Sequence, residues 1–329
     1  MNGSRLRSSK LVAFSLLLTI VGAALSSGMA ADAYPSHPVR FIIPFAAGGG
    51  ADTVARMVAK GLSDRVGQQF VTDNRAGAGG IIGAELGARA AADGYTLTFV
   101  PASFTMQPAL RKLPYDTVKS FVPISRVGKG DYVLVVTPAV PANSVKELIA
   151  YAKANPGKLF FGTAGAGSTA HMFIELFKVS AGVDINVVHF KGGNQQVIDL
   201  LGGYSNGVMI SAPAVRPHVL SGKLKALATT GLQRSSSFPN VPTLNEAALP
   251  GFEAIVWWGI LAPAGTPASI VSRLDRETKE VLGIPEIRKA FSEQGVEPDY
   301  QDSAAFRSFM IREIENWKRV VAKAHVKLD

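Results

Sequence analysis

The sequence contains no cysteine among its 329 residues. This excludes disulfides, thiolate catalysis, cysteine-ligated zinc and a lipid anchor on a cysteine. Charged residues are also few, at 18%, whereas hydrophobic residues make up 47%. A chain of this composition can bury sizeable cores, which excludes wholesale disorder. Its length predicts about two domains.

Long hydrophobic runs are scarce as well, and the longest lies near the N-terminus. Three basic residues precede an apolar stretch over residues 11–25, and small residues follow as far as Ala33. This order is typical of a secretory signal peptide, which we expect to comprise residues 1–33. The stretch is short for a membrane span, and an uncleaved N-terminal anchor is the alternative. We therefore expect an exported protein.

Positive charge exceeds negative charge without being concentrated in one stretch. The net charge is +9, and loss of residues 1–33 removes three basic residues and one aspartate, which leaves +7. Because no stripe rich in arginine and lysine is present, we do not expect nucleic acid as a partner. An anionic small molecule fits the charge better.

Segments typical of strands and helices alternate from Val39 onward. This alternation predicts an α/β fold of parallel sheets with helices on both faces. The expected strands are residues 39–43, 69–72, 96–100, 132–136, 159–162, 185–190, 224–229 and 255–262. Two such series joined by strands predict two lobes, with the chain crossing between them near residues 130–133 and 254–259.

A first glycine-rich loop, residues 44–53, lies between an expected strand and an expected helix. Glycine lets backbone N–H groups approach a ligand, and a helix N-terminus favours negative charge. The loop lacks the Gly-Lys-[Ser/Thr] ending of a nucleotide P-loop. Two simpler readings stay open here: the glycines form a tight turn, and Asp52 is a helix N-cap.

Two further loops are rich in glycine. The loop over residues 74–83 fails the dinucleotide fingerprint because Ile82 occupies the third glycine position. The loop over residues 162–171 again ends where a helix is expected to begin, so its amides and hydroxyls suit a second contact to an anion. Ordinary N-capping by Ser168 or Thr169 is the alternative.

Catalytic and metal-ligating patterns are sparse. The five histidines include no pair at i,i+4 spacing beside a carboxylate motif, so we expect no metal site and no cofactor. Ser168 and His171 have poor geometry for a nucleophile and its base, and no G-x-S-x-G elbow is present. We therefore expect no catalytic residue and no enzyme. For His171 itself, capping or packing is favoured over ligand contact.

Seven motifs follow one another along almost the whole chain after the expected signal peptide. They are residues 34–52, 74–80, 93–97, 190–193, 199–203, 239–247 and 261–267. In this order they resemble the tripartite tricarboxylate transporter receptor family, the Bug-type solute-binding proteins. The resemblance implies a two-lobed periplasmic-binding-protein fold, type II-like, in which each lobe is a mostly parallel sheet flanked by helices. We expect residues 34–131 and 257–329 to form one lobe and residues 132–256 the other.

The resemblance also implies what the protein binds. Such a periplasmic protein closes on a small carboxylate and delivers it to a membrane permease made of one large and one small subunit. Docking on a sensor kinase is the alternative, and an exported hydrolase is a weaker one. We expect a monomer, because opening and closing require free lobes.

The ligand-binding residues implied by the resemblance come from both lobes. They are Phe45, Ala46, Ala47, Gly48, Gly49 and Asp52 of the first loop, Ala102, Ser103 and Phe104 after the third strand, and Ala164, Gly165, Ser168, Thr169, His171, Lys191 and Ser211 opposite. Many relatives have an acidic residue where this chain has Asn206 and Ser211. Without one, a ligand ammonium lacks its partner, so we expect a carboxylate without an amine. Phe104 and the pair Trp257 and Trp258 leave an aromatic acid open.

Overall fold

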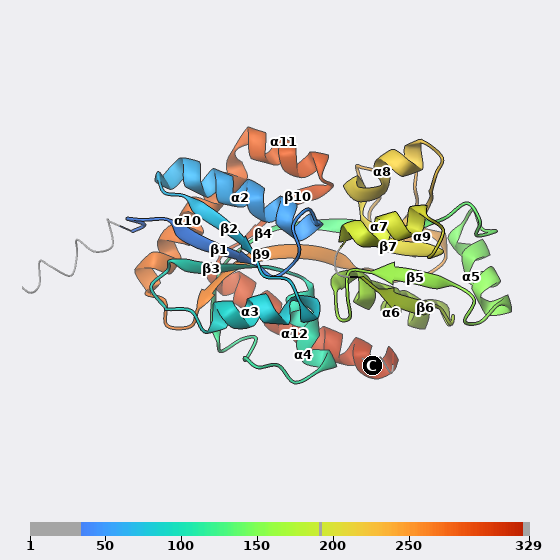
Figure 1. Ribbon diagram of the computed structural model, residues 1–329, viewed down its shortest axis with the longest axis horizontal. Coiled ribbons are helices and arrows are strands. Elements are labelled where there is room, and N and C mark those ends of the chain that lie inside the picture. The colour runs from blue at the N-terminus through green and yellow to red at the C-terminus, as the bar shows by residue number, and fades with distance from the viewer. Residues whose placement is uncertain (1–33, 191–192, 325–329) are drawn as a thin grey trace, which may run out of the picture.

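The computed structural model describes residues 34–190 and 193–324. The expected signal peptide and Lys191 therefore lie outside the described residues. Figure 1 shows two lobes side by side, each built of strands covered by helices. Their strands form one ten-stranded sheet that continues from one lobe into the other. Within the described part of the chain, no helix is long and apolar enough to cross a membrane.

The first lobe is built on three parallel strands. These are β1 (Val39–Ile43), β2 (Phe70–Asn74) and β3 (Thr96–Pro101), in the order β2-β1-β3. Their apolar side chains are mostly buried, as expected for strands with helices on both faces. The helices of this part are α2 (Gly50–Val66), η1 (Ala78–Gly80), α3 (Ile81–Ala88), α4 (Ser103–Leu110), α10 (Ala268–Gly283) and α11 (Pro285–Glu293).

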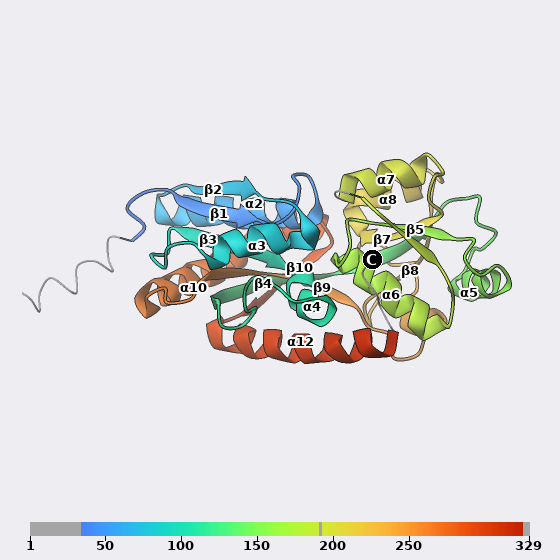
Figure 2. The same cartoon turned by 60° about the horizontal axis from the view of Figure 1, so that its bottom comes forward.

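The second lobe repeats this arrangement. Its parallel strands are β5 (Phe160–Thr163), β6 (Asn186–His189) and β7 (Gly207–Ser211). The strand β8 (Lys225–Thr229) pairs antiparallel with β4. Figures 1 and 2 show α6 and α7 on opposite faces of this sheet. The helices are α5 (Val145–Ala154), α6 (Thr169–Ala181), α7 (Gly193–Leu201), α8 (Ala212–Leu220) and α9 (Leu244–Ala247).

Two antiparallel strands, β9 (Ile255–Pro263) and β4 (Phe121–Val136), occupy the centre of the sheet, and β10 (Val296–Gln301) pairs antiparallel with β4 to one side of this order. The first part of β4 pairs with β9 and β10, and its last part pairs with β7 and β8. The sheet is thus mixed instead of mostly parallel, because the strand that leaves the first lobe and the strand that returns to it run in opposite directions.

Two segments of the chain lie where the strands of the two lobes meet. The single strand β4 carries the first crossing, since Asp131 pairs with Ile255 of β9 while Tyr132 pairs with Ser211 of β7. The second segment precedes β9, where the Ala254 N–H donates to the carbonyl of Thr230 at 2.9 Å.

A long C-terminal helix adds a further connection between the lobes. The helix α12 (Ser303–Ala324) packs on β4 and α4 and reaches α6 of the second lobe. There Trp317 stacks on Phe173 with ring centroids 6.2 Å apart. Figure 2 shows α12 running along the side of the first lobe and ending near α6 of the second.

Candidate ligand-binding site

A cavity of about 90 Å³ lies between the two lobes. From the first lobe it is lined by Phe45, Ala46, Gly48, Gly49, Gly50, Ala51 and Pro101, and from the central strand β9 by Val256 and Trp258. From β4 and the second lobe it is lined by Tyr132, Ala164, Ser168, Thr169, Ala170, Gly193, Asn194, Gln196, Ile210, Ser211 and Ala214. Both lobes therefore contribute backbone and side chains to one site.

The first residues of four helices line this cavity. Gly50 and Ala51 belong to α2, Thr169 to α6, Gly193 to α7, and Ala214 to α8. The first amides of a helix lack acceptors within the helix, and the helix dipole places positive charge at this end. The N-cap of α2 is Gly49, which has no side chain to accept from these amides. An anion in the cavity would be surrounded by such donors.

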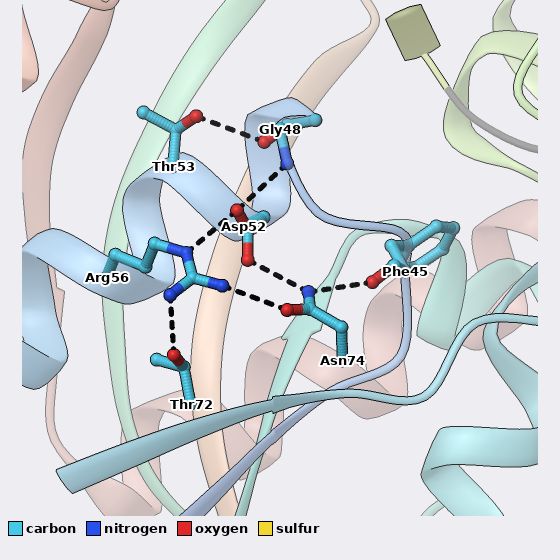
Figure 3. Close-up of polar contacts among 8 residues, drawn as sticks. Phe45, Gly48, Asp52, Thr53, Arg56, Thr72 and Asn74 are labelled. Carbon is cyan, nitrogen blue, oxygen red and sulfur yellow. Dashed lines mark hydrogen bonds and ion pairs between the residues drawn. The ribbon is translucent and has the colours of Figure 1, made fainter. Parts of the chain in front are cut away.

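The first glycine loop is held in shape by one buried carboxylate (Figure 3). The Asp52 Oδ2 atom accepts from the Gly48 N–H and from Arg56 Nε, both at 2.9 Å, and Oδ1 accepts from Asn74 Nδ2 at 2.8 Å. The same Asn74 nitrogen donates to the Phe45 carbonyl at 3.0 Å. This network joins the start of α2 to the end of β2 and fixes the loop that leads from β1 into α2.

This network also shows which role Asp52 has in the loop. The helix α2 begins at Gly50, so Asp52 is not its N-cap. Burial alone would raise the pKa of the Asp52 carboxyl, but the hydrogen bonds from Arg56, Gly48 and Asn74 outweigh burial and lower this pKa. The carboxylate is therefore ionised at neutral pH and is engaged inside the loop. Because the Gly48 N–H donates to this carboxylate, it is not directed at the cavity.

The opposing loop is held by a histidine behind it. The backbone N–H of Gly167 donates to Nδ1 of the His171 ring at 2.9 Å. The backbone N–H of His171 donates to the Ser168 hydroxyl at 3.3 Å. Ser168 is the N-cap of α6. Burial, with smaller contributions from His189, Lys178 and Arg111, lowers the pKa of His171 to about 4, so the ring is neutral. The imidazole bonds to the loop backbone, and Ser168 and His171 are not arranged as a catalytic dyad.

The structure brings together about half of the residues expected from the sequence. Phe45, Ala46, Gly48, Gly49, Ala164, Ser168, Thr169 and Ser211 line the cavity. Ala47, Asp52, Ala102, Ser103, Phe104, Gly165 and His171 are not in its lining. The Phe104 ring stacks on Tyr115 at 6.0 Å and meets the edge of Phe121 at 5.3 Å, which places it in the core.

Several lining residues were not expected. The strands and the helix that carry these residues were expected from the sequence. Their place in the cavity wall was not expected, and this applies to Pro101, Tyr132 and Gln196. Trp258 lines the cavity, whereas its neighbour Trp257 does not, because successive strand residues point to opposite faces. Burial raises the pKa of Tyr132 to about 12, so its hydroxyl stays neutral.

The described part of the lining has no lysine, arginine, histidine, aspartate or glutamate. Across residues 34–190 and 193–324, no group of three histidine, aspartate or glutamate side chains is placed to hold a metal ion. What the described residues offer a ligand is backbone amides, hydroxyls, side-chain amides and an apolar wall.

Comparison with known proteins identifies the family. Residues 54–326 match the profile described as "Tripartite tricarboxylate transporter family receptor". The chain belongs to this receptor family. Over 320 residues the receptor is 39% identical to Protein BugT of Bordetella pertussis, a match that covers 95% of this chain and 98% of BugT. As a member of this family, it is a periplasmic-type solute-binding receptor.

Two solved structures are similar to the receptor over their full fold. One is an R. palustris protein solved with adipate, with 34% identity, a TM-score of 0.85, and coverage of 89% of this chain and 99% of that one. The other is MatC from Rhodopseudomonas palustris with bound malate, with 29% identity, a TM-score of 0.83, and coverage of 88% and 100%. The two-lobed α/β fold expected from the sequence is confirmed by these structures.

Proposed function

We propose that this receptor captures a small carboxylate between its lobes and delivers it to the membrane permease of a tripartite transporter, without converting it. The observation that carries the proposal is the convergence of α2, α6, α7 and α8, from both lobes, on one cavity. Helix N-termini favour a negative ligand without any charged side chain. The relatives solved with adipate and with malate bind acids of this class.

We further propose that the ligand carries no ammonium group. An ammonium would lie among the positive ends of four helices, and the described lining supplies no carboxylate to pair with it. Asn206, one of the two positions that replace an acidic residue, accepts from the Phe160 N–H at 2.8 Å and so supports the strand instead of the ligand. Ser211, the other position, does line the cavity but is neutral.

The cavity also offers an apolar surface. Trp258 and Tyr132 lie in its wall and can pack against the carbon skeleton of a bound acid. Such a surface suits an aliphatic chain and an aromatic ring alike.

Capture by closure fits the way the lobes are joined. We propose residues 34–131 with 257–329 as one lobe and residues 132–256 as the other, because β4 changes its pairing partners between Asp131 and Tyr132. Rotation about the crossings would enclose the ligand and form a new surface across both lobes for the permease. Export through a signal peptide over residues 1–33 and a monomeric state belong to the same proposal. The family assignment favours this role over a sensor-kinase partner or a hydrolase.

Thermal unfolding of refolded, ligand-free protein tests the binding function. The panel comprises short mono-, di- and tricarboxylates, aromatic acids, amino acids, and the methyl esters of the acids as uncharged controls. A ligand at 100 times its Kd adds about 2.7 kcal/mol, which raises the Tm by several degrees for a chain of this size. We expect this shift for a short carboxylate and not for its ester. Binding of amino acids alone, or of no acid at all, would contradict the proposal.

A further inference from the structure

We propose a second ligand site, for a small organic cation, behind the strands that cross between the lobes. The site is a cavity of about 640 Å³, which we call the rear cavity. Its walls come from β4, β9, β10 and α12, and from α6 and the loop of residues 231–236 in the second lobe. It is separate from the proposed carboxylate cavity, so the inference goes beyond the proposed function.

The two cavities lie on opposite faces of the same strands. Successive strand residues point to opposite faces. On β9, Trp257 lines the rear cavity and Trp258 lines the carboxylate cavity. On β4, Asp131 lines the rear cavity and Tyr132 the carboxylate cavity. Asp131 also pairs across the strands with Ile255, which lines the rear cavity as well. The rear cavity therefore lies directly behind the crossing.

The charged groups of the rear cavity include more carboxylates than cations. Five acidic and three basic side chains line it. Arg126 pairs with Asp299 inside the lining, and Lys129 Nζ lies 3.9 Å from a lining carboxylate. The third basic residue, Arg234, pairs with a carboxylate outside the lining. Three lining carboxylates form no ion pair with the described residues: those of Asp131, Glu253 and Glu313.

The ionisation of these carboxyls favours a bound cation. Burial, with the carboxylates of Glu297 and Glu253 nearby, raises the pKa of Asp131 to about 6. Burial also raises the pKa of Glu313. A positive charge in the cavity would stabilise the ionised form of both groups. The carboxylate cavity, in contrast, has no acidic side chain in its described lining.

Aromatic rings supply the apolar part of the wall. Trp257, Phe309 and Trp317 line the rear cavity together with these carboxylates. The Arg126 guanidinium already lies over the Phe309 ring, 4.4 Å from its centroid, and the faces of such rings attract positive charge. In the part of the chain that the structure describes, no three acidic or histidine side chains are placed to hold a metal ion. The wall thus suits an alkylammonium ion better than a metal.

The position of the rear cavity also connects it with closure. Rotation about the crossing that narrows the carboxylate cavity widens the space behind the strands. In this structure Gln107 and Gly167 join the lobes by a hydrogen bond, and the rear cavity is the larger of the two. A cation that fills it should stabilise the closed form. Each ligand then raises the affinity for the other by the same factor.

Calorimetry with alkylammonium ions tests the inference. Tetramethylammonium and choline are titrated into ligand-free protein at constant ionic strength, and 3,3-dimethylbutanol is the uncharged isostere of choline. We expect choline to bind at least about tenfold more tightly than this isostere. Glu313→Gln removes a charge and keeps the acceptor for the Trp317 indole N–H. We expect it to raise the Kd of choline about fivefold or more.

Glu315→Gln is the matched control, because Glu315 lies on the same helix, is exposed, and does not line the rear cavity. It should bind choline normally. No binding of either ammonium ion to the wild type, or equal binding of choline and its isostere, would overturn the inference, and so would equal effects of the two substitutions. The wild-type titrations need no variant and contain no acid, so they decide the matter whether or not the proposed function holds.

A second titration tests the connection with closure. Saturating choline should lower the Kd of the acid identified by thermal unfolding about fivefold. The same effect should be lost in Glu313→Gln at that choline concentration. An unchanged or raised Kd in the wild type would show that the rear cavity does not favour the closed form.

Discussion

The buried side chain of Gln107 joins the two lobes by a hydrogen bond. Its Nε2 atom donates to the carbonyl of Gly167, 60 residues further along the chain, at 3.0 Å. The same nitrogen donates to the carbonyl of Gly79 at 3.1 Å. Gly167 precedes α6 in the second lobe, whereas Gly79 and Gln107 belong to the first. A bond of this kind is present only when the lobes are together.

Removing this bond should weaken ligand binding. We expect Gln107→Leu to raise the Kd by about two- to tenfold, because a typical hydrogen bond contributes about 0.5–1.5 kcal/mol and this one stabilises the closed form. Calorimetry on the two proteins measures the effect. The matched control is Gln68→Leu, since Gln68 donates to the Ser36 carbonyl on the surface of one lobe. Equal effects of the two substitutions would contradict a role in closure.

A side chain at Gly49 should fill the binding site without disturbing the fold. A Cβ atom there would come no closer than 3.7 Å to the Ala46 carbonyl oxygen, which is ordinary contact, and Gly49 has a φ of −85° that any residue adopts. We expect Gly49→Val to abolish the ligand-induced rise in Tm and to leave the unliganded Tm within a few degrees. Gly283→Val, at a site with open space, is the control and should bind normally. Normal binding by Gly49→Val would remove this loop from the site.

The half-buried Asp131 at the crossing should make stability depend on pH. Burial, with Glu297 and Glu253 nearby and Lys129 opposing them, raises the pKa of this carboxyl from 3.8 to about 6. The folded state therefore holds the proton more tightly than the unfolded chain. This carboxyl lowers the free energy of unfolding as the pH rises from about 4 to 6, and the loss is complete above that range.

Asp131→Asn should remove this penalty. We expect a gain of at most about 3 kcal/mol at pH 8, and much less at pH 4, because two units of pKa correspond to about 2.7 kcal/mol. Chemical denaturation at the two pH values measures the difference. The exposed Asp64, paired with Lys60, gives a control in Asp64→Asn that should change stability by less than about 1 kcal/mol. A gain that is the same at both pH values would exclude titration of Asp131 as its source.

Tryptophan fluorescence should report binding through one residue. The three tryptophans are Trp257, Trp258 and Trp317, and only Trp258 is in the described lining of the cavity. We expect the ligand to change the emission of the wild type and of Trp257→Phe, and to leave Trp258→Phe unchanged. A full response in Trp258→Phe would place the ligand elsewhere.

The strands that could be predicted are those with continuous apolar runs. Residues 39–43 are the clearest example, and β1 has these bounds. The first part of β4 was missed, because Pro123, Gly128 and Gly130 argue against a strand. The register of β4 against β9 shifts near Pro123 and near Gly128, and such irregularities accommodate these residues. The strand β10 was missed for a similar reason, since Pro298 lies at a register shift.

The site could be predicted only in its loops. Glycines between a strand and a helix mark a backbone that can contact a ligand, and Gly48 and Gly49 do line the cavity. Phe104 shows the limit, because an apolar residue after a strand is equally suited to a cleft and to a core. Gln196 had no local feature to distinguish it from Gln195. Its burial depends on how α7 lies against β5, which is a tertiary contact.

The continuous strand β4 restricts how the two halves of the molecule can move. One ribbon of backbone is hydrogen-bonded into both ends of the structure, from Phe121 in one lobe to Val136 in the other. A ribbon held in this way bends and twists, but it does not stretch or slide. A shift of the lobes along the cleft would strain this strand, so the proposed closing movement should return the same amides to the same places. Alignment of the binding site is thus built into the covalent chain.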